Sequence, residues 1–367
     1  MKIALPQQQF LKHLQMVEHT INERSTLPIL ANVLIQAEGN NLVLMATDLD
    51  IGIQCRVPLS QQAVSGAVTL PARKLTTIVR ELPDTVVTLE AMKNHTALLN
   101  CGTSSFRIPG LPAEDFPTLP AAQEADKILI SQADLKKLIK RTAYAMSSEE
   151  TRFVLNGTLV LANKGSLTLV ATDGRRLALA TTALKEGEHA AVEVIIPSKM
   201  LRELDRLLQE DNEEPVTVTP LQDNQVMFRF EPVTMITRLI EGQFPPYKKV
   251  IPPATKTVMS CPRKELTDAI RRASLMTTAT SQAVIFDVDE NRLIVSKESP
   301  EIGSAREELA VSYSGEKMRI AFNPLFWIEA FKTIDGDEVR IELGGAERPA
   351  VIREDDFTYI VLPMKTA

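Results

Sequence analysis

The chain has little of what most enzyme sites are built from. Its 367 residues include 3 cysteines, 4 histidines, 1 tryptophan and 15 glycines. The three cysteines are odd in number and far apart, which argues against a disulfide framework and against a zinc site. Scarce glycine disfavours phosphate-cradling loops, and no P-loop, Gly-x-Gly-x-x-Gly, Gly-x-Ser-x-Gly or His-x-x-x-His pattern occurs. We therefore expect a binding or scaffold protein with no metal and no cofactor.

Long apolar runs and an excess of positive charge are also absent. No run is long enough to cross a bilayer, and residues 1–6 lack the apolar core and cleavage site of a signal peptide. With the unpaired thiols, this predicts a cytoplasmic protein that does not bind membranes. The net charge of −6 taken alone disfavours a tight nucleic-acid binder. The length suggests two or three domains.

An apolar run followed by Ala-Thr-Asp occurs twice, ending at Asp48 and at Asp173. Each Asp begins a turn signal, because Asp bonds its own backbone and the residues after it start a second apolar strand. The two stretches, which contain Thr47 and Thr172, lie about 125 residues apart. This spacing predicts an internal repeat.

The order of predicted elements repeats three times. Helical spacing of apolar residues predicts helices over 7–22, 71–82, 131–146, 197–209, 262–276 and 323–333. Three strands follow each helix. They are predicted over 29–37, 42–46, 51–57, 86–91, 95–101, 105–109, 157–162, 167–171, 176–181, 216–219, 225–230, 235–239, 283–288, 292–297, 307–311, 338–343, 350–354 and 359–362. Proline-rich stretches near Phe116 and Phe244 separate the copies. This predicts an α+β protein of three repeated domains, 1–122, 123–250 and 251–367, each with two helices packed on antiparallel sheets.

Basic residues concentrate in the helices. The six helical windows sum to +8, so the rest of the chain carries −14. If the helices share one surface, that surface is positive and attracts phosphate without reading bases. The alternative is that the charged helix faces are simply solvated.

Three aspartates allow a different function. Asp48, Asp50 and Asp173 are carboxylates of the kind that hold metal ions in nucleic-acid enzymes. Each stands in a turn context, so turn formation is the preferred interpretation. A third possibility is a peptide-binding adaptor that never meets DNA.

A series of segments in fixed order is more specific than any of these patterns. They are 23–30 (Glu-Arg-Ser-Thr-Leu-Pro-Ile-Leu), 46–49, 70–75, 111–117, 155–157, 171–177 (Ala-Thr-Asp-Gly-Arg-Arg-Leu), 242–247 (Gly-Gln-Phe-Pro-Pro-Tyr), 313–315 and 362–365 (Leu-Pro-Met-Lys). Through them the chain resembles the bacterial DNA polymerase III beta subunits, the beta sliding clamps, over essentially its whole length. The resemblance implies a homodimer of three-domain subunits, closed head to tail into a six-domain ring around double-stranded DNA.

The resemblance also implies a function. Such a ring is a non-enzymatic processivity factor: it tethers the replicative DNA polymerase, is placed on DNA by a clamp loader, and recruits other replication and repair proteins that carry clamp-binding peptide motifs. Helices line the hole, which agrees with the charge count. Because enclosure holds the DNA, local contacts can stay weak and the protein can slide.

Family positions carry over to individual residues. The DNA-contact positions hold Arg24, Arg73, Glu149, Phe153 and Val154, and the helix charge adds Lys199. Glu149 and Val154 depart from the neutral amide and the aromatic residue that are common there. The implied partner-peptide pocket consists of Leu155, Thr172, Gly174, Arg175, Arg176, Leu177, Pro245, Lys249, Val250, Ile360, Leu362, Pro363 and Met364.

The subunit contact is expected between the first domain of one chain and the third of the other. Leu275 and Met276 match apolar interface positions, and acidic residues of the third domain are expected to face basic residues of the first. The implied interface residues are Lys74, Arg107, Leu275, Met276, Glu298 and Glu301, with Glu307 and Glu308 nearby. Ser105 replaces an arginine that is common in the family, so one ion pair is expected to be missing, and a surface pair contributes little.

Overall fold

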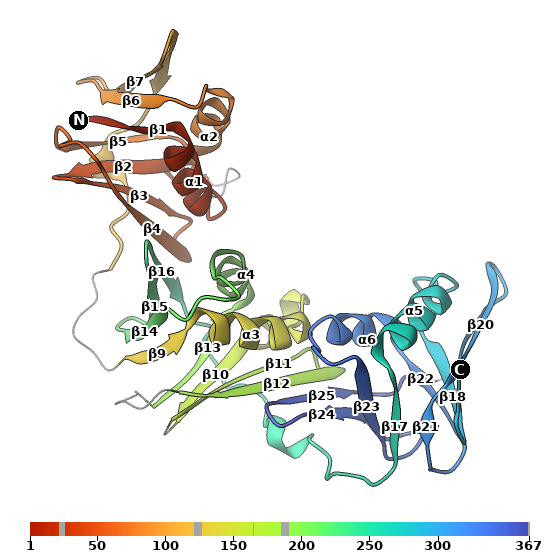
Figure 1. The fold of residues 1–367 in the computed structure, drawn as a ribbon. Helices are drawn as coiled ribbons and strands as arrows, with labels where there is room; N and C mark the ends of the chain where they lie inside the picture. The colour runs from red at the N-terminus through yellow and green to blue at the C-terminus, as the bar shows by residue number, and fades with distance from the viewer. Residues whose placement is uncertain (22–25, 121–126, 164, 185–190, 366–367) are drawn as a thin grey trace. The chain divides into compact units, whose positions relative to one another are not determined.

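The computed structural model describes residues 1–367 except 22–25, 121–126, 164, 185–190 and 366–367 (Figure 1). The chain forms two compact units. The first consists chiefly of Met1–Ala133 and Arg202–Leu239, and the second chiefly of Asp134–Gly187, Ala191–Leu201 and Ile240–Ala367. Among the described residues, no helix is long and apolar enough to span a bilayer.

One plan, a strand that leads into a helix followed by three strands, occurs six times along the chain. The first two copies are β1 (Lys2–Pro6), α1 (Gln7–Glu18), β2 (Asn32–Glu38), β3 (Asn41–Thr47), β4 (Ile51–Pro58), and β5 (Gly66–Pro71), α2 (Ala72–Glu81), β6 (Val86–Ala91), β7 (Thr96–Cys101), β8 (Ser104–Pro109). The third and fourth are β9 (Ile128–Ser131), α3 (Gln132–Thr142), β10 (Gly157–Asn163), β11 (Ser166–Thr172), β12 (Arg176–Ala183), and β13 (Val192–Pro197), α4 (Ser198–Leu207), β14 (Pro215–Leu221), β15 (Gln225–Phe230), β16 (Val233–Arg238). The last two are β17 (Val258–Pro262), α5 (Arg263–Ser274), β18 (Val284–Asp289), β19 (Arg292–Ser299), β20 (Gly303–Ala310), and β22 (Met318–Phe322), α6 (Pro324–Phe331), β23 (Glu338–Leu343), β24 (Ala350–Arg353), β25 (Phe357–Val361), with the short β21 (Ser312–Tyr313) between them.

The predicted α+β class, the six helices and the three strands after each are confirmed, but the strand before each helix was missed. These six strands run into their helices directly or through a single residue, and the proline that ends three of them, Pro71, Pro197 or Pro262, was predicted as the first residue of the helix. The helix predicted over 71–82 therefore starts one residue too early, because Pro71 ends β5 and α2 begins at Ala72. The predicted strand over 29–37 was also partly wrong, since Pro28–Ala31 form a 3₁₀ turn before β2. The helix predicted over 7–22 ends at Glu18, and residue 22 lies outside the described chain.

The leading strands are exchanged between neighbouring copies. β1 pairs with β6 of the second copy, giving the sheet order β1-β6-β7-β8, while β5 pairs with β2 of the first. The third and fourth copies exchange β9 and β13 in the same way, and the last two copies exchange β17 and β22. Two copies therefore form one interlocked structure, and neither sheet of a pair is complete without the other.

The last strand of a copy in one pair of copies lies beside the last strand of a copy in the next pair. In the first unit, β4 lies antiparallel to β16, with Ile53 opposite Met235, in an eight-stranded sheet. In the second unit, β12 lies antiparallel to β25, with Leu177 opposite Ile360, in a nine-stranded sheet. The remaining two last strands, β8 and β20, each lie at the end of a four-stranded sheet.

The two Ala-Thr-Asp turns are the same down to their hydrogen bonds. Thr47 Oγ1 donates to Ile51 O and accepts from Leu49 N–H. Asp48 Oδ1 accepts from the N–H groups of Asp50 and Ile51. At the second turn, Thr172 and Asp173 make the four corresponding bonds. This confirms the predicted repeat. It also shows that the aspartates form turns, and among the described residues no His, Cys, Asp or Glu cluster could hold a metal ion.

The first of these turns is strained, which gives a prediction. Leu49 has φ of 79°, whereas glycine occupies the equivalent position 174. A side chain costs about 1–2 kcal/mol in this left-handed region, and the flexibility of glycine offsets about half of that gain. Since Leu49 is exposed, Leu49→Gly is expected to stabilise the protein by about 0.5–1 kcal/mol in thermal or urea unfolding. Leu49→Ala keeps a Cβ and is the control; an equal gain from alanine would contradict the backbone explanation.

Candidate functional site

The Asp173 turn and the C-terminal segment meet within the second unit. Beyond the β12–β25 ladder, Leu362 N–H donates to Arg175 O at 2.9 Å, and two residues later Met364 N–H donates to Ala321 O of β22 at 2.8 Å. The C-terminal segment is thereby held at both ends. The structure thus brings together the predicted pocket residues of 172–177 and of 360–364.

An apolar cluster lies beneath this junction. Leu177 and Ile360 are buried in it together with Leu159, Val170 and Phe244. Leu155 and Tyr247 pack against it from the side. Three large apolar residues of the predicted pocket are instead exposed: Leu362 (42% exposed), Met364 (37%) and Val250. The predicted pocket therefore divides into a buried floor, where Leu177 and Ile360 are ordinary core residues, and an exposed apolar rim.

Arg176 is part of the scaffold of this junction. It is buried, and its Nε lies 3.1 Å from Asp173 Oδ2 while its other nitrogens donate to Glu329 of α6 and to the carbonyl of Tyr144. The guanidinium also stacks over the Phe326 ring at 4.4 Å. Burial would lower the pKa of Arg176, but the neighbouring acidic groups raise it, so the guanidinium stays charged. Arg176, which the resemblance placed in the pocket, thus holds the Asp173 turn against α6 and the Tyr144 carbonyl.

The equivalent junction in the first unit is closed by the chain itself. Arg238 N–H donates to Asp50 O, as Leu362 does to Arg175. Gly52 stands where the second turn has Leu177, and a Cβ on Gly52 would lie 2.3 Å from Leu119 Cδ2. Leu119 therefore covers the floor of the first junction. Only the second junction combines an apolar floor with the exposed rim of Leu362 and Met364.

Some of the basic residues counted in the helices bind acidic groups or carbonyl groups of the protein itself. Arg141 of α3 is buried in ion pairs with Asp356, Asp335 and Glu354. Burial would raise the pKa of Asp356, but the hydrogen bond and charge of Arg141 lower it overall. Arg206 of α4 donates to the carbonyls of Gln15 and Met16 near the end of α1. The cations left exposed on helices include Arg73 of α2 and Lys199 of α4.

The segment Glu149–Val154 lies beside the Asp173 turn. The Glu149 carboxylate lies 3.4 Å from Arg152 and 3.8 Å from Arg175, so two guanidinium groups offset its charge. Phe153 is exposed, whereas Val154 packs against the apolar cluster. Arg24 lies outside the described residues.

The predicted interface residues lie on exposed surfaces. Leu275, directly after α5, is 68% exposed, and Lys74, Arg107, Glu298 and Glu301 are exposed as well. Glu307 lies 2.6 Å from Arg272, and this bond lowers the pKa of Glu307. Glu308 lies 3.0 Å from Arg306. The sequence did not single out Phe106 of β8 and Ile302 before β20, two large exposed apolar residues.

Comparisons with known proteins cover the whole chain. The profiles of the DNA polymerase III beta subunit N-terminal, central and C-terminal domains match residues 1–120, 129–246 and 248–365. A beta sliding clamp of Pseudomonas aeruginosa is 33% identical over 368 residues, covering 100% of both chains. A solved clamp from that organism, bound to griselimycin, has a TM-score of 0.94 at 32% identity, and the Bacillus subtilis clamp has 0.94 at 31%, each covering 100% of both chains.

Proposed function

Because this chain belongs to the family of DNA polymerase III beta subunits, the beta sliding clamps, we propose that it works as a ring around duplex DNA. In this role it is a processivity factor of DNA replication and not an enzyme. The observation that carries the proposal is the full-length, in-order match of three clamp domains. We assign the domains to 1–122, 123–250 and 251–367, bounds that lie close to the matched ranges, and we expect the protein to act in the cytoplasm.

The strand topology supports a ring closed by two chains. Last strands pair copy to copy at β4–β16 and at β12–β25, so the same rule would pair β8 with β20. Within one chain each of these is an end strand, and end strands offer unpaired backbone groups to another chain. A head-to-tail homodimer in which β8 of each chain pairs with β20 of the other satisfies both strands with twofold symmetry. Six domains then close into one ring.

Side chains beside the two end strands fit such a contact. Leu275, Met276 and Phe106 supply apolar surface. Lys74 and Arg107 of the N-terminal domain would face Glu298 and Glu301 of the C-terminal domain. Since Glu307 and Glu308 already pair with arginines of their own unit, they are the weaker candidates for ion pairs across the contact.

For DNA we assign weak, non-specific contacts. Arg24, Arg73 and Lys199 supply charge for phosphates, and Phe153 offers an exposed ring to the DNA. Glu149 is offset by two arginines, so we expect little repulsion from it. Val154 belongs more to the peptide pocket, because it packs on the apolar cluster.

For partner proteins we assign the junction of β12 and β25. Its exposed rim, Leu362, Met364 and Val250, would receive apolar side chains of clamp-binding peptides from the replicative polymerase, the clamp loader and repair proteins. Thr172, Gly174 and Arg175 border the rim, and Pro245, Lys249 and Pro363 flank it. The soft side chain of Met364 suits several different ligands.

Retention on circular DNA tests the ring. Protein loaded onto a nicked circular plasmid by a bacterial clamp loader and ATP is expected to co-elute with the DNA in gel filtration. Cutting the circle with a restriction enzyme should release it, because a ring slides off a free end. The same enzyme on a plasmid without its site is the control. Equal retention on cut and uncut circles would contradict enclosure of the DNA.

A further inference from the structure

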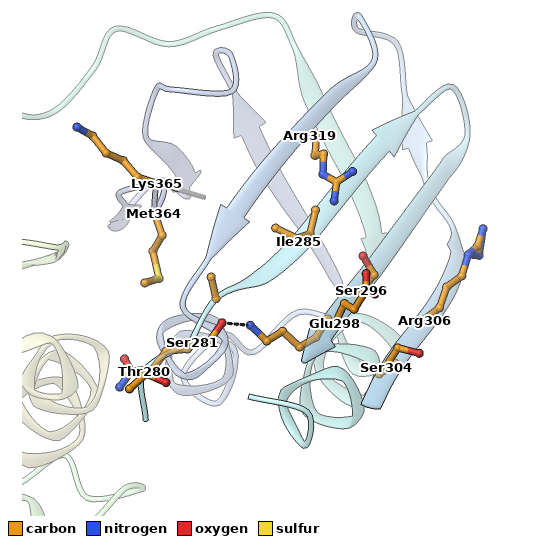
Figure 2. A pocket seen from close by; sticks show the side chains of 14 residues that line it. Thr280, Ser281, Ile285, Ser296, Glu298, Ser304, Arg306, Arg319, Met364 and Lys365 are labelled. Carbon is orange, nitrogen blue, oxygen red and sulfur yellow. Dashed lines mark hydrogen bonds between the residues drawn. The ribbon is translucent and has the colours of Figure 1, made fainter. Parts of the chain in front are cut away.

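A separate cavity opens on the C-terminal domain, beside the sheet β20-β19-β18-β22. It has a volume of about 570 Å³ and is lined by side chains from β18, β19, β20 and β22, the segment before β18, and the C-terminal Met364 and Lys365 (Figure 2). Its charged lining groups are Lys297, Arg306, Arg319, Lys365 and a single carboxylate, Glu298. Hydroxyl groups of serine and threonine supply most of its other polar surface.

Lys297 is the unusual member of this lining. The residue is only 6% exposed, and its Nζ donates to Ser281 Oγ at 2.5 Å. Among the described residues it has no carboxylate within ion-pair distance. A buried ammonium with one neutral partner is costly, and an anion in the cavity would offset that cost. Arg306 and Arg319 differ, because Glu308 and Asp287 already lie beside them.

The cavity is continuous with the proposed peptide pocket through one residue. Met364 belongs to the exposed rim and also lines the cavity. Leu362 is bonded to the Asp173 turn, whereas Met364, two residues on, is bonded to β22. A peptide that covers the rim therefore lies next to the cavity that Met364, Lys365 and Lys297 line.

We propose that this cavity receives acidic residues that flank the apolar part of a clamp-binding peptide, with Lys297 as the buried counter-charge and Lys365 at the entrance. The inference rests on the proposed function and deepens it. The rim selects apolar side chains, and the cavity selects partners whose flank is negative. Since the cavity lies on one side of the rim, only one end of the peptide reaches it.

Peptide binding to the full-length protein tests this inference. The probe is a fluorescein-labelled peptide of the clamp-binding segment of the polymerase III alpha subunit, bare or extended at either end by Glu-Glu or by the neutral Gln-Gln. At one end, Glu-Glu is expected to bind about five- to tenfold more tightly than Gln-Gln in fluorescence polarisation. Raising the salt from about 50 mM to about 500 mM should reduce this advantage.

Variants locate the effect. Lys297→Met should erase the Glu-Glu advantage and leave the affinity for the bare peptide unchanged, while Lys332→Met, an exposed lysine of the same unit outside the cavity, should keep both. Lys297→Met is also expected to raise the melting temperature, because it removes a buried charge with no counter-ion. If that variant does not fold, Lys365→Gln takes its place and should reduce the advantage in part.

The outcomes separate this inference from the function on which it rests. If the bare peptide does not bind, the proposed pocket is wrong. If it binds but Glu-Glu and Gln-Gln are equal at both ends, the pocket stands and the cavity proposal is overturned. If low millimolar inorganic phosphate cancels the advantage while chloride of equal ionic strength does not, phosphate competes with Glu-Glu for the same cations, which supports the proposal; an advantage that persists in Lys297→Met and in Lys365→Gln would overturn it.

Discussion

A protein carrying Leu275→Asp and Met276→Ser is expected to sediment as a monomer at micromolar concentration, where the unchanged protein is expected to sediment as a dimer. Leu275 is largely exposed in the single chain and would be buried by the partner in the proposed contact. Placing a carboxylate in a desolvated apolar contact costs several kcal/mol, and about 4 kcal/mol weakens a dimer roughly a thousandfold. Sedimentation velocity over a range of concentrations measures the change.

The control for this variant is Leu325→Asp. Leu325 begins α6 in the same unit and is 59% exposed, close to the 68% of Leu275, but it lies outside the proposed contact. It should leave the dimer intact. Both variants should melt like the unchanged protein, since Leu275 and Leu325 are exposed in the chain itself and Met276 is only half-buried. An undiminished dimer in the Leu275→Asp, Met276→Ser protein would show that α5 does not end at the subunit contact.

The second large effect is expected at the peptide pocket. Leu362→Ala with Met364→Ala should lower the affinity for the bare alpha-subunit peptide roughly a hundredfold, because each truncation removes apolar surface worth about 1.5 kcal/mol on binding. The melting temperature should change little, since both side chains are exposed. Fluorescence polarisation and thermal unfolding measure the two effects separately.

Leu177→Ala is expected to behave differently. Leu177 is buried in the floor, so its truncation leaves a cavity and should cost about 2–5 kcal/mol of stability as well as peptide affinity. Leu129→Ala, an exposed leucine of β9 in the first unit, is the control and should change neither. A rim variant that binds peptide as tightly as the unchanged protein would refute the assignment of Leu362 and Met364. Both pocket variants should remain dimers.

Features formed by neighbouring residues could be predicted from the sequence. The turns at Asp48 and Asp173 were found because their hydrogen bonds join residues at most four positions apart. Strands bounded by such turns were predicted closely, and those over 86–91, 225–230 and 338–343 match β6, β15 and β23 residue for residue. The strands before the helices were missed because each runs directly, or through one residue, into the helical pattern that follows it.

The sequence grouped pocket residues that the structure brings together at the β12–β25 junction, but it did not predict which of them are buried. Apolar periodicity treats Leu177 and Leu362 alike, yet one is floor and the other rim, because burial depends on what packs above them. The charge count likewise did not show that Arg141 and Arg206 bind groups of the protein itself, because their partners are distant in the chain. Neither Lys297 nor its cavity gave any sequence signal, since its surroundings come from segments far apart in the chain.

The sequence by itself determined the order of the helices and of the three strands after each, the threefold repeat and the family, because local hydrogen bonding, periodicity and motif order are properties of neighbouring residues. Only the tertiary structure decided that copies exchange their leading strands, that β8 and β20 are left at sheet ends, and that Leu119 closes one junction while the other keeps an exposed rim. These features depend on contacts between residues far apart in the chain, whose free energy is set by packing and burial and leaves no local pattern.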